Sequence, residues 1–210
     1  MVHKNVWERI YKDVPLGRIP WRTASATWFY QLVDNGTIPV GTTLELGCGT
    51  GEKAAYLAEK GCKVVAVDIS QTAVKHARSL AKQARVEIDF YAKDATDLSF
   101  LKNRKFDFVL DFANLHGIAR KKQQTYAGEI AKHTQTSSLF FLRCFSKRTP
   151  NRKKDYFIDQ LVGSWKIWYF SEKDILALFG SDFKVVKRHK EDYKAPVVDI
   201  YFDEYLMERL

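Results

Sequence analysis

The sequence lacks the features that mark secreted, disulfide-stabilised and membrane-spanning proteins. Its 210 residues include three cysteines, an odd number without a C-x-x-C pair, which favours reduced buried thiols over disulfides or a zinc site. No apolar run reaches the ~18 residues of a transmembrane helix. The first residues also lack the apolar segment of a secretory signal. We therefore expect a cytoplasmic protein with no membrane span and no metal centre.

The size and charge of the chain limit the class of protein further. With 46% hydrophobic and 28% charged residues, the composition is that of a globular protein long enough for one α/β domain. The formal net charge is +9, and a basic run extends from Arg143 to Lys154. Such runs are more often a solvated surface than a binding face, but they also suit RNA or another anionic partner. Nucleic acid is therefore a possible partner at this point, although not the favoured one.

The most informative stretch is residues 42–51, which read TTLELGCGTG. A short apolar strand runs into three glycines at alternate positions, and an amphipathic helix is expected directly after them. A second strand over 63–68 ends in Asp68, where a carboxylate can accept hydrogen bonds from ribose hydroxyls. Glycines allow positive φ and close approach to a ligand, while the helix N-terminus favours an anionic group. The pattern predicts half of a nucleotide-binding unit.

The glycine spacing separates two classes of nucleotide-dependent enzyme. A dinucleotide fingerprint needs a glycine three residues after the second one, where this chain has Glu52, so a nicotinamide oxidoreductase is disfavoured. The pattern present is acidic-x-Gly-x-Gly-x-Gly beginning at Glu45. It resembles motif I of the class I S-adenosylmethionine (SAM) dependent methyltransferases. Pro20-Trp21 resembles a segment ahead of motif I in small-molecule methyltransferases of the thiopurine and tellurite-resistance type.

The resemblance implies the fold. We expect an α/β, Rossmann-like, seven-stranded and mostly parallel sheet in the order 3-2-1-4-5-7-6, with strand 7 antiparallel and helices on both faces. One domain over 1–210 should carry an N-terminal helical cap in 1–36 and a basic, aromatic insertion in 146–170. The apolar spacing predicts strands over 44–46, 63–68, 86–90, 106–111, 138–145, 183–188 and 197–205. It predicts helices over 3–13, 23–34, 52–60, 71–85, 121–133 and 171–179.

The resemblance also implies the cofactor, SAM, and candidate contacts to it. Asp94 stands where the family places a carboxylate against the adenine amine, and Asp68-Ile69-Ser70 matches the family's usual end of the second strand. Trp21 is expected to close over the cofactor. The full set of expected cofactor residues is Trp21, Glu45, Gly47, Cys48, Gly49, Gly51, Asp68, Ile69, Asp94, Ala95, Asp111 and Phe112.

Catalysis is expected to depend mainly on orientation. A methyl sulfonium is already electrophilic, so the protein has to hold a nucleophile in line with it. A base is needed only for an acceptor that is protonated at the working pH. The loop after the fourth strand makes His116 the candidate base and Asp111 an orienting carboxylate. Candidate walls of the acceptor pocket are Tyr11, Trp21, Arg143, Trp165 and Trp168.

The absence of two motifs limits the class of methyl acceptor. Asp111 begins the sequence DFAN, so the Pro-Pro-Tyr/Phe motif of amino-methylating DNA enzymes and the Pro-Cys nucleophile of cytosine-ring enzymes are both absent there. The favoured prediction is a SAM-dependent methyltransferase acting on a small-molecule S, N, O or chalcogen acceptor. Two alternatives stay open: an RNA or protein methyltransferase that docks through the basic insertion, and a non-catalytic SAM-binding protein.

Overall fold

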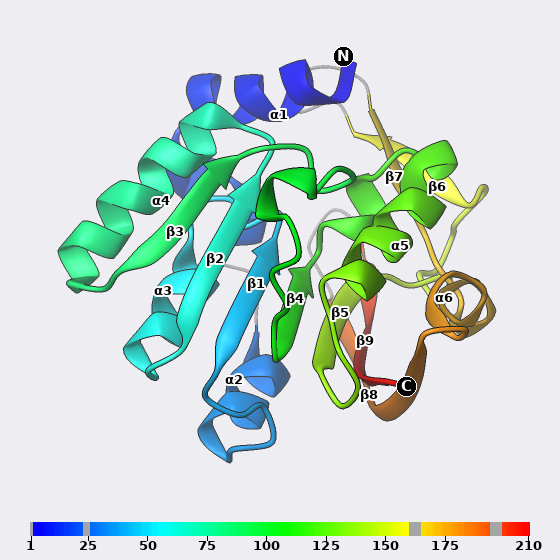
Figure 1. Cartoon of the computed structure of the whole chain (residues 1–210). Helices are drawn as coiled ribbons and strands as arrows, with labels where there is room; N and C mark the ends of the chain where they lie inside the picture. The colour runs from blue at the N-terminus through cyan, green and yellow to red at the C-terminus, as the bar shows by residue number, and fades with distance from the viewer. Residues whose placement is uncertain (1, 23–25, 160–164, 194–198) are drawn as a thin grey trace.

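A computed structural model describes residues 2–22, 26–159, 165–193 and 199–210. A single seven-stranded sheet crosses the molecule, with helices on both of its faces (Figure 1). Its strands are β1 (Thr42–Leu46), β2 (Lys63–Asp68), β3 (Ile88–Ala92), β4 (Phe108–Phe112), β5 (Leu139–Phe145), β8 (Phe183–Tyr193) and β9 (Ile200–Arg209). The sheet order is β3-β2-β1-β4-β5-β9-β8. The pairings from β3 to β5 are parallel, whereas β9 runs antiparallel to β5 and β8.

The predicted fold class and strand order are confirmed. Counted within this sheet, β8 and β9 are strands 6 and 7, so the order reads 3-2-1-4-5-7-6. Outside the sheet, β6 (Tyr156–Asp159) and β7 (Trp165–Trp168) form a separate antiparallel pair in the insertion. The sequence does not predict this pair, because strands of four residues offer too few positions to establish an alternating pattern.

The helices follow the predicted pattern, with boundaries shifted by a few residues. The side chain of Ser70 accepts a hydrogen bond from the Ala73 N–H and so begins the long helix after β2. The expected start of the second helix at 23 lies outside the described residues. No helix of the described residues is long and apolar enough to cross a membrane. The helices are α1 (Val2–Asp13), α2 (Thr27–Asp34), α3 (Glu52–Glu59), α4 (Gln71–Ala84), α5 (Gln123–Lys132) and α6 (Glu172–Phe179).

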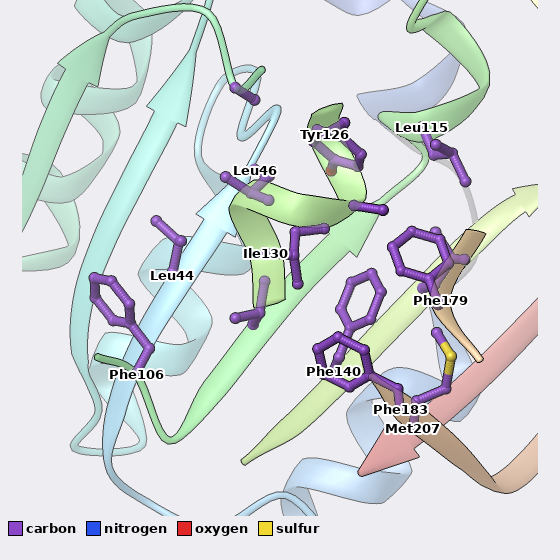
Figure 2. Close-up of a cluster of buried hydrophobic side chains, with 14 of the residues drawn as sticks. Leu44, Leu46, Phe106, Leu115, Tyr126, Ile130, Phe140, Phe179, Phe183 and Met207 are labelled. Atoms are coloured by element: carbon purple, nitrogen blue, oxygen red, sulfur yellow. The ribbon is translucent and has the colours of Figure 1, made fainter. Parts of the chain in front are cut away.

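Two apolar cores lie on opposite faces of the sheet. One contains Leu44 and Leu46 together with the aromatic rings beneath α5 and α6, and Figure 2 shows Phe140, Phe179 and Phe183 grouped in it. The other lies under α2, α3 and α4. Successive strand residues point to opposite faces, so Glu45 faces the second core rather than the first. This alternation places a buried carboxylate on the face covered by α3.

A third apolar cluster covers the carboxyl ends of the strands, the edge at which open α/β sheets bind their ligands. Helix α1 crosses this edge, and the β6–β7 pair lies beside it (Figure 1). The cluster joins Tyr11 of α1 to Trp165 of β7, with Trp7 and Trp21 packed against it. Residues 2–22 and 165–168 therefore close the same edge. Helix α2, which the sequence analysis grouped with the cap, packs instead on the sheet face.

Candidate functional site

The glycine turn after β1 has the backbone geometry that the sequence predicts. Gly47, Gly49 and Gly51 adopt φ values of 73°, 54° and 83°, which residues with a Cβ rarely adopt. A Cβ on Gly51 would lie 2.8 Å from the Ala77 Cβ, so this glycine lets α3 and α4 pack closely. A Cβ on Gly49 would lie 2.7 Å from the hydroxyl of Tyr11. Side chains of α1 and α4 therefore pack directly against the turn, which glycine without a Cβ allows.

Asp68 ends β2 beside this turn, and its side chain is buried. Its carboxylate accepts hydrogen bonds from the N–H groups of Gly49 and Ser70, both at 2.8 Å. Burial raises the pKa of Asp68 to about 6, so the group is mostly ionised at pH 7. A carboxylate has roughly four acceptor positions. The carboxylate can therefore accept further hydrogen bonds, as the predicted contact with ribose hydroxyls requires.

Glu45 and Lys53 flank the glycine turn in sequence, and both are buried and interact electrostatically. Glu45 is 2% exposed, and its Oε2 has no hydrogen-bond partner among the described residues. Burial raises the pKa of Glu45 to about 8, although the Lys53 ammonium opposes that shift. Lys53 lies in the first turn of α3, and burial lowers its pKa. Its Nζ lies 4.3 Å from the centroid of the Phe112 ring. The sequence pattern does not single out Lys53, whose only signal is its place two residues after the last glycine.

Asp94 lies just after β3. Its Oδ1 accepts hydrogen bonds from the N–H and hydroxyl of Thr96, at 2.9 and 2.8 Å, and its Oδ2 accepts one from Lys122 at 2.8 Å. Burial opposes ionisation of Asp94, but the hydrogen bonds from Lys122 and Thr96 hold its pKa below the ordinary value. The side chain caps the following turn, and its neighbour Ala95 is buried. Its contact with an adenine amine stays a prediction.

Asp111, at the end of β4, holds the loop that follows it. Its carboxylate accepts hydrogen bonds from the N–H groups of Asn114 and Leu115, at 2.6 and 3.0 Å, and from the Tyr126 hydroxyl at 2.7 Å. Burial raises the pKa of Asp111 to about 7. The same loop packs over the glycine turn, since a Cβ on Gly47 would lie 2.5 Å from the Asn114 Oδ1. Asp111 is therefore tied into the backbone of its own loop.

His116 lies in the turn Leu115–Gly117 and is 6% exposed. Its ring stacks on Phe145, with centroids 4.1 Å apart and planes 3° from parallel. Its Nδ1 has no hydrogen-bond partner within the described residues. Burial, with a smaller effect of the Arg143 charge, lowers the pKa of His116 to about 3. The imidazole is thus neutral at pH 7 and a weak proton acceptor, and its role as a base stays a prediction.

Arg143 is buried, and its guanidinium contacts the Phe112 ring. It pairs in register with Phe112 of β4 and Glu204 of β9 and is 2% exposed. Its guanidinium lies 4.8 Å from the Phe112 ring centroid and 3.9 Å from that of Phe202. Its Nη1 donates hydrogen bonds to Glu204 at 2.7 Å and to Glu191. The predicted pocket wall is thus part of an ion-pair network that links β5 to β8 and β9.

The aromatic residues expected to close the site largely come together. Trp21 donates a hydrogen bond from Nε1 to the Tyr11 hydroxyl at 3.0 Å. Trp7 bridges Trp21 and Trp165, with ring centroids 5.6 and 5.5 Å away. Trp168 does not join this group, because it packs on Tyr156 of the hairpin at 5.3 Å.

These features fit a nucleoside that carries a cationic amino-acid arm. The glycine turn has no Cβ that would block a close approach, and the Asp68 carboxylate can accept hydrogen bonds from hydroxyls. The Glu45 Oε2 is a buried carboxylate oxygen without a partner, which costs about 1–3 kcal/mol unless a donor or cation meets it. Within the described residues, no cluster of His, Cys, Asp and Glu could hold a metal ion. The described residues of the site therefore suit a nucleotide-like cofactor.

Comparison with known proteins agrees with this assignment. Residues 43–137 match a family model described as a methyltransferase domain. An uncharacterized methyltransferase of Schizosaccharomyces pombe is 31% identical over 109 residues, which cover 52% of this chain and 74% of that protein. Thiocyanate methyltransferase 1 of Brassica oleracea is 27% identical over 128 residues, covering 60% of this chain and 55% of that protein.

A solved structure shows the same fold. The 1,6-didemethyltoxoflavin-N1-methyltransferase of Burkholderia thailandensis superposes with a TM-score of 0.78 at 20% identity, covering 99% of this chain and 87% of that one. Fold and site together define a nucleotide-binding α/β enzyme with an enclosed edge. The chain belongs to the class I SAM-dependent methyltransferases, a family of enzymes that takes its methyl group from SAM.

Proposed function

We propose that the protein methylates a small-molecule acceptor at S, N, O or a chalcogen. The observation that carries this proposal is the aromatic cover formed by α1 and β7 over the carboxyl edge of the sheet. A cover of this kind favours an acceptor small enough to be enclosed with the cofactor and excludes water from the reacting groups. The thiocyanate methyltransferase of B. oleracea, named for a small acceptor, supports the same class.

The proposal gives each part of the site a role. The cofactor supplies an electrophilic methyl group on a sulfonium. Asp68 would hold the ribose hydroxyls, and Glu45 would meet the cationic arm. Asp94 and Ala95 would flank the adenine, while the glycine turn allows the approach. Cys48, Ile69, Asp111, Phe112 and Trp21 complete the proposed cofactor set.

The cover is attached to the cofactor-binding half of the sheet through Glu8 of α1. Its carboxylate accepts hydrogen bonds from the hydroxyl of Ser70, at 2.8 Å, and from the hydroxyl of Thr72. Both partners lie at the start of α4, directly after Asp68. Closure over the cofactor and the position of α1 are therefore coupled in this proposal.

The contacts of the basic insertion argue against docking of RNA. Lys147 pairs with Asp155 and Asp174, at 3.0 and 3.1 Å. Arg148 pairs with Asp203 of β9 at 2.8 Å. These cations fasten the insertion to itself and to the sheet, so their charge is largely compensated within the protein.

The test has two stages. Calorimetric titration with S-adenosylhomocysteine establishes cofactor binding. Transfer of a labelled methyl group from SAM is then measured with thiols, amines, selenite, tellurite and RNA. We expect turnover with a small acceptor. RNA methylation with affinity that falls steeply with salt would replace this proposal with the RNA alternative. Cofactor binding without turnover on any acceptor would favour a non-catalytic binding protein.

A further inference from the structure

Both candidate bases, Asp111 and His116, are held by contacts within the fold. The Asp111 carboxylate is committed to backbone and tyrosine donors in its own loop. His116 is buried against Phe145 and is neutral at pH 7. An acceptor that must lose a proton during transfer would therefore gain little from these two groups. This arrangement suits an acceptor that is already deprotonated when it binds.

Lys53 places a positive charge beside Phe112 at the end of β4. Its side chain is 9% exposed and lies over the Phe112 ring, which follows Asp111 at the end of β4. No carboxylate of the described residues lies within salt-bridge distance of its Nζ. Arg143 contacts the same ring, but its guanidinium is bound to Glu204 and Glu191. Of the two cations at Phe112, Arg143 therefore has carboxylate partners in direct contact, whereas Lys53 has none among the described residues.

Other titratable groups surround Lys53 from each element packed against it. Glu45 of β1 and Glu52 of α3 attract its charge, whereas Arg143 of β5 repels it. Tyr30 of α2 lies near the same two glutamates. A cationic cofactor arm at Glu45 would compete with Lys53 for that carboxylate. Binding of the cofactor would then leave the Lys53 ammonium available to an anion.

We propose that Lys53 is a specificity-determining residue that selects an anionic sulfur or chalcogen acceptor, and this inference rests on the proposed small-molecule methyltransferase function. The ammonium holds the acceptor beside Phe112 as an anion. A lone pair of the anion forms the bond to the methyl carbon. The bond from that carbon to the sulfonium sulfur breaks, and its electron pair stays on that sulfur. No proton moves, and the charges of acceptor and sulfonium cancel.

The test compares acceptors that differ in charge. Hydrosulfide and thiocyanate serve as anionic sulfur nucleophiles, and dimethyl sulfide and pyridine serve as neutral ones. Lys53→Met keeps an unbranched side chain over Phe112 without the charge, while Lys53→Arg keeps the charge. Lys60→Met is the matched control, because Lys60 is an exposed cation at the end of the same helix, paired with Asp34. Thermal unfolding confirms that each variant is folded.

We expect Lys53→Met to lower kcat/KM for the anions by about tenfold or more, the size expected for loss of a charge-assisted contact. Turnover of neutral acceptors, measured at saturating cofactor, should change by less than about threefold, within the weaker effects of a neutral contact. The affinity for S-adenosylhomocysteine should not fall, because the cofactor arm no longer competes with Lys53 for Glu45. Lys53→Arg should recover much of the anion activity, and Lys60→Met should match the wild type. Equal losses for anions and neutral acceptors, or a change confined to cofactor affinity, would overturn the inference and reduce Lys53 to a counter-ion of Glu45.

A binding readout separates this inference from the proposed function. Isotope-labelled thiocyanate is added to the protein saturated with S-adenosylhomocysteine, and its NMR line width is measured. Broadening in the wild type that disappears in Lys53→Met supports an anion site at Lys53 even without turnover. Absence of broadening in the wild type, or equal broadening in the variant, overturns it. If no acceptor is methylated, the result contradicts the proposed function instead.

Discussion

The Tyr11 hydroxyl lies so close to Gly49 that a Cβ on this glycine would come within 2.7 Å of it. The contact joins the cover to the glycine turn, and Trp21 fixes the hydroxyl by donating a hydrogen bond to it. The proposed cofactor turn and the position of α1 are therefore in direct contact at Gly49.

Substitution of Gly49 tests that link. Gly49→Val should abolish measurable S-adenosylhomocysteine binding, because the side chain fills the space below Tyr11 and strains a backbone with φ of 54°. Calorimetric titration gives the affinity. Gly128→Ala is the control, since a Cβ there meets nothing within 4 Å. Retained affinity in Gly49→Val would refute the assignment of the glycine turn.

The role of Asp68 is tested by an isosteric change. Asp68→Asn should weaken cofactor binding by about 1.5–3 kcal/mol, because the charge-assisted hydrogen bonds to hydroxyls are lost. Asp97→Asn serves as the control, since Asp97 is an exposed carboxylate that accepts a hydrogen bond from the Ser99 N–H. The dissociation constants are compared by calorimetry. An unchanged constant in Asp68→Asn would place the ribose elsewhere.

Glu45 predicts a specific pH dependence of cofactor affinity. Its pKa is about 8 in the free protein, and a cationic ligand arm would lower it by favouring the ionised form. Binding below pH 8 therefore releases a proton from Glu45, so affinity should rise with pH up to about 8 and then level off. Calorimetry between about pH 6.5 and 8 in two buffers measures both effects. Glu45→Gln should remove the slope, and a slope that persists in this variant would exclude Glu45 as its source.

The buried network around Arg143 predicts a large effect on stability. Arg143→Met should lower the free energy of unfolding by about 3–5 kcal/mol, because Glu204 would stay buried without its cation. Arg209→Met, which removes a partly exposed ion pair with Asp182, should cost about 1 kcal/mol or less. Denaturant unfolding provides the measurement. Similar losses in both variants would show that burial of the Arg143 network adds little.

Much of the fold could be predicted from local patterns. The apolar run before Gly47 and the strand ending in Asp68 lie in adjacent parallel strands, as expected from their spacing. Gly49 and Asp68 are joined by a hydrogen bond, as the motif predicts. The motif describes a strand–turn–helix–strand unit of neighbouring elements, whose geometry is largely determined by the short connections between them.

The features that could not be predicted depend on contacts between different elements of the fold. Lys53 of α3 is of interest because it contacts Phe112 of β4 and interacts electrostatically with Glu45 of β1. The residues next to Lys53 in the sequence do not indicate these interactions. The basic run was open to an RNA interpretation, because the partner of Arg148 is Asp203, 55 residues further along the chain. The stacking of His116 on Phe145, 29 residues further along the chain, likewise has no signal in the sequence near His116.

The most direct test of the account is calorimetric titration of the wild-type protein with S-adenosylhomocysteine and, separately, with NAD. We predict saturable one-to-one binding of S-adenosylhomocysteine that Gly49→Val abolishes, and no binding of NAD. Binding of NAD in preference, or binding of neither nucleotide by the folded protein, would contradict the assignment of the glycine turn and Asp68 as a SAM site.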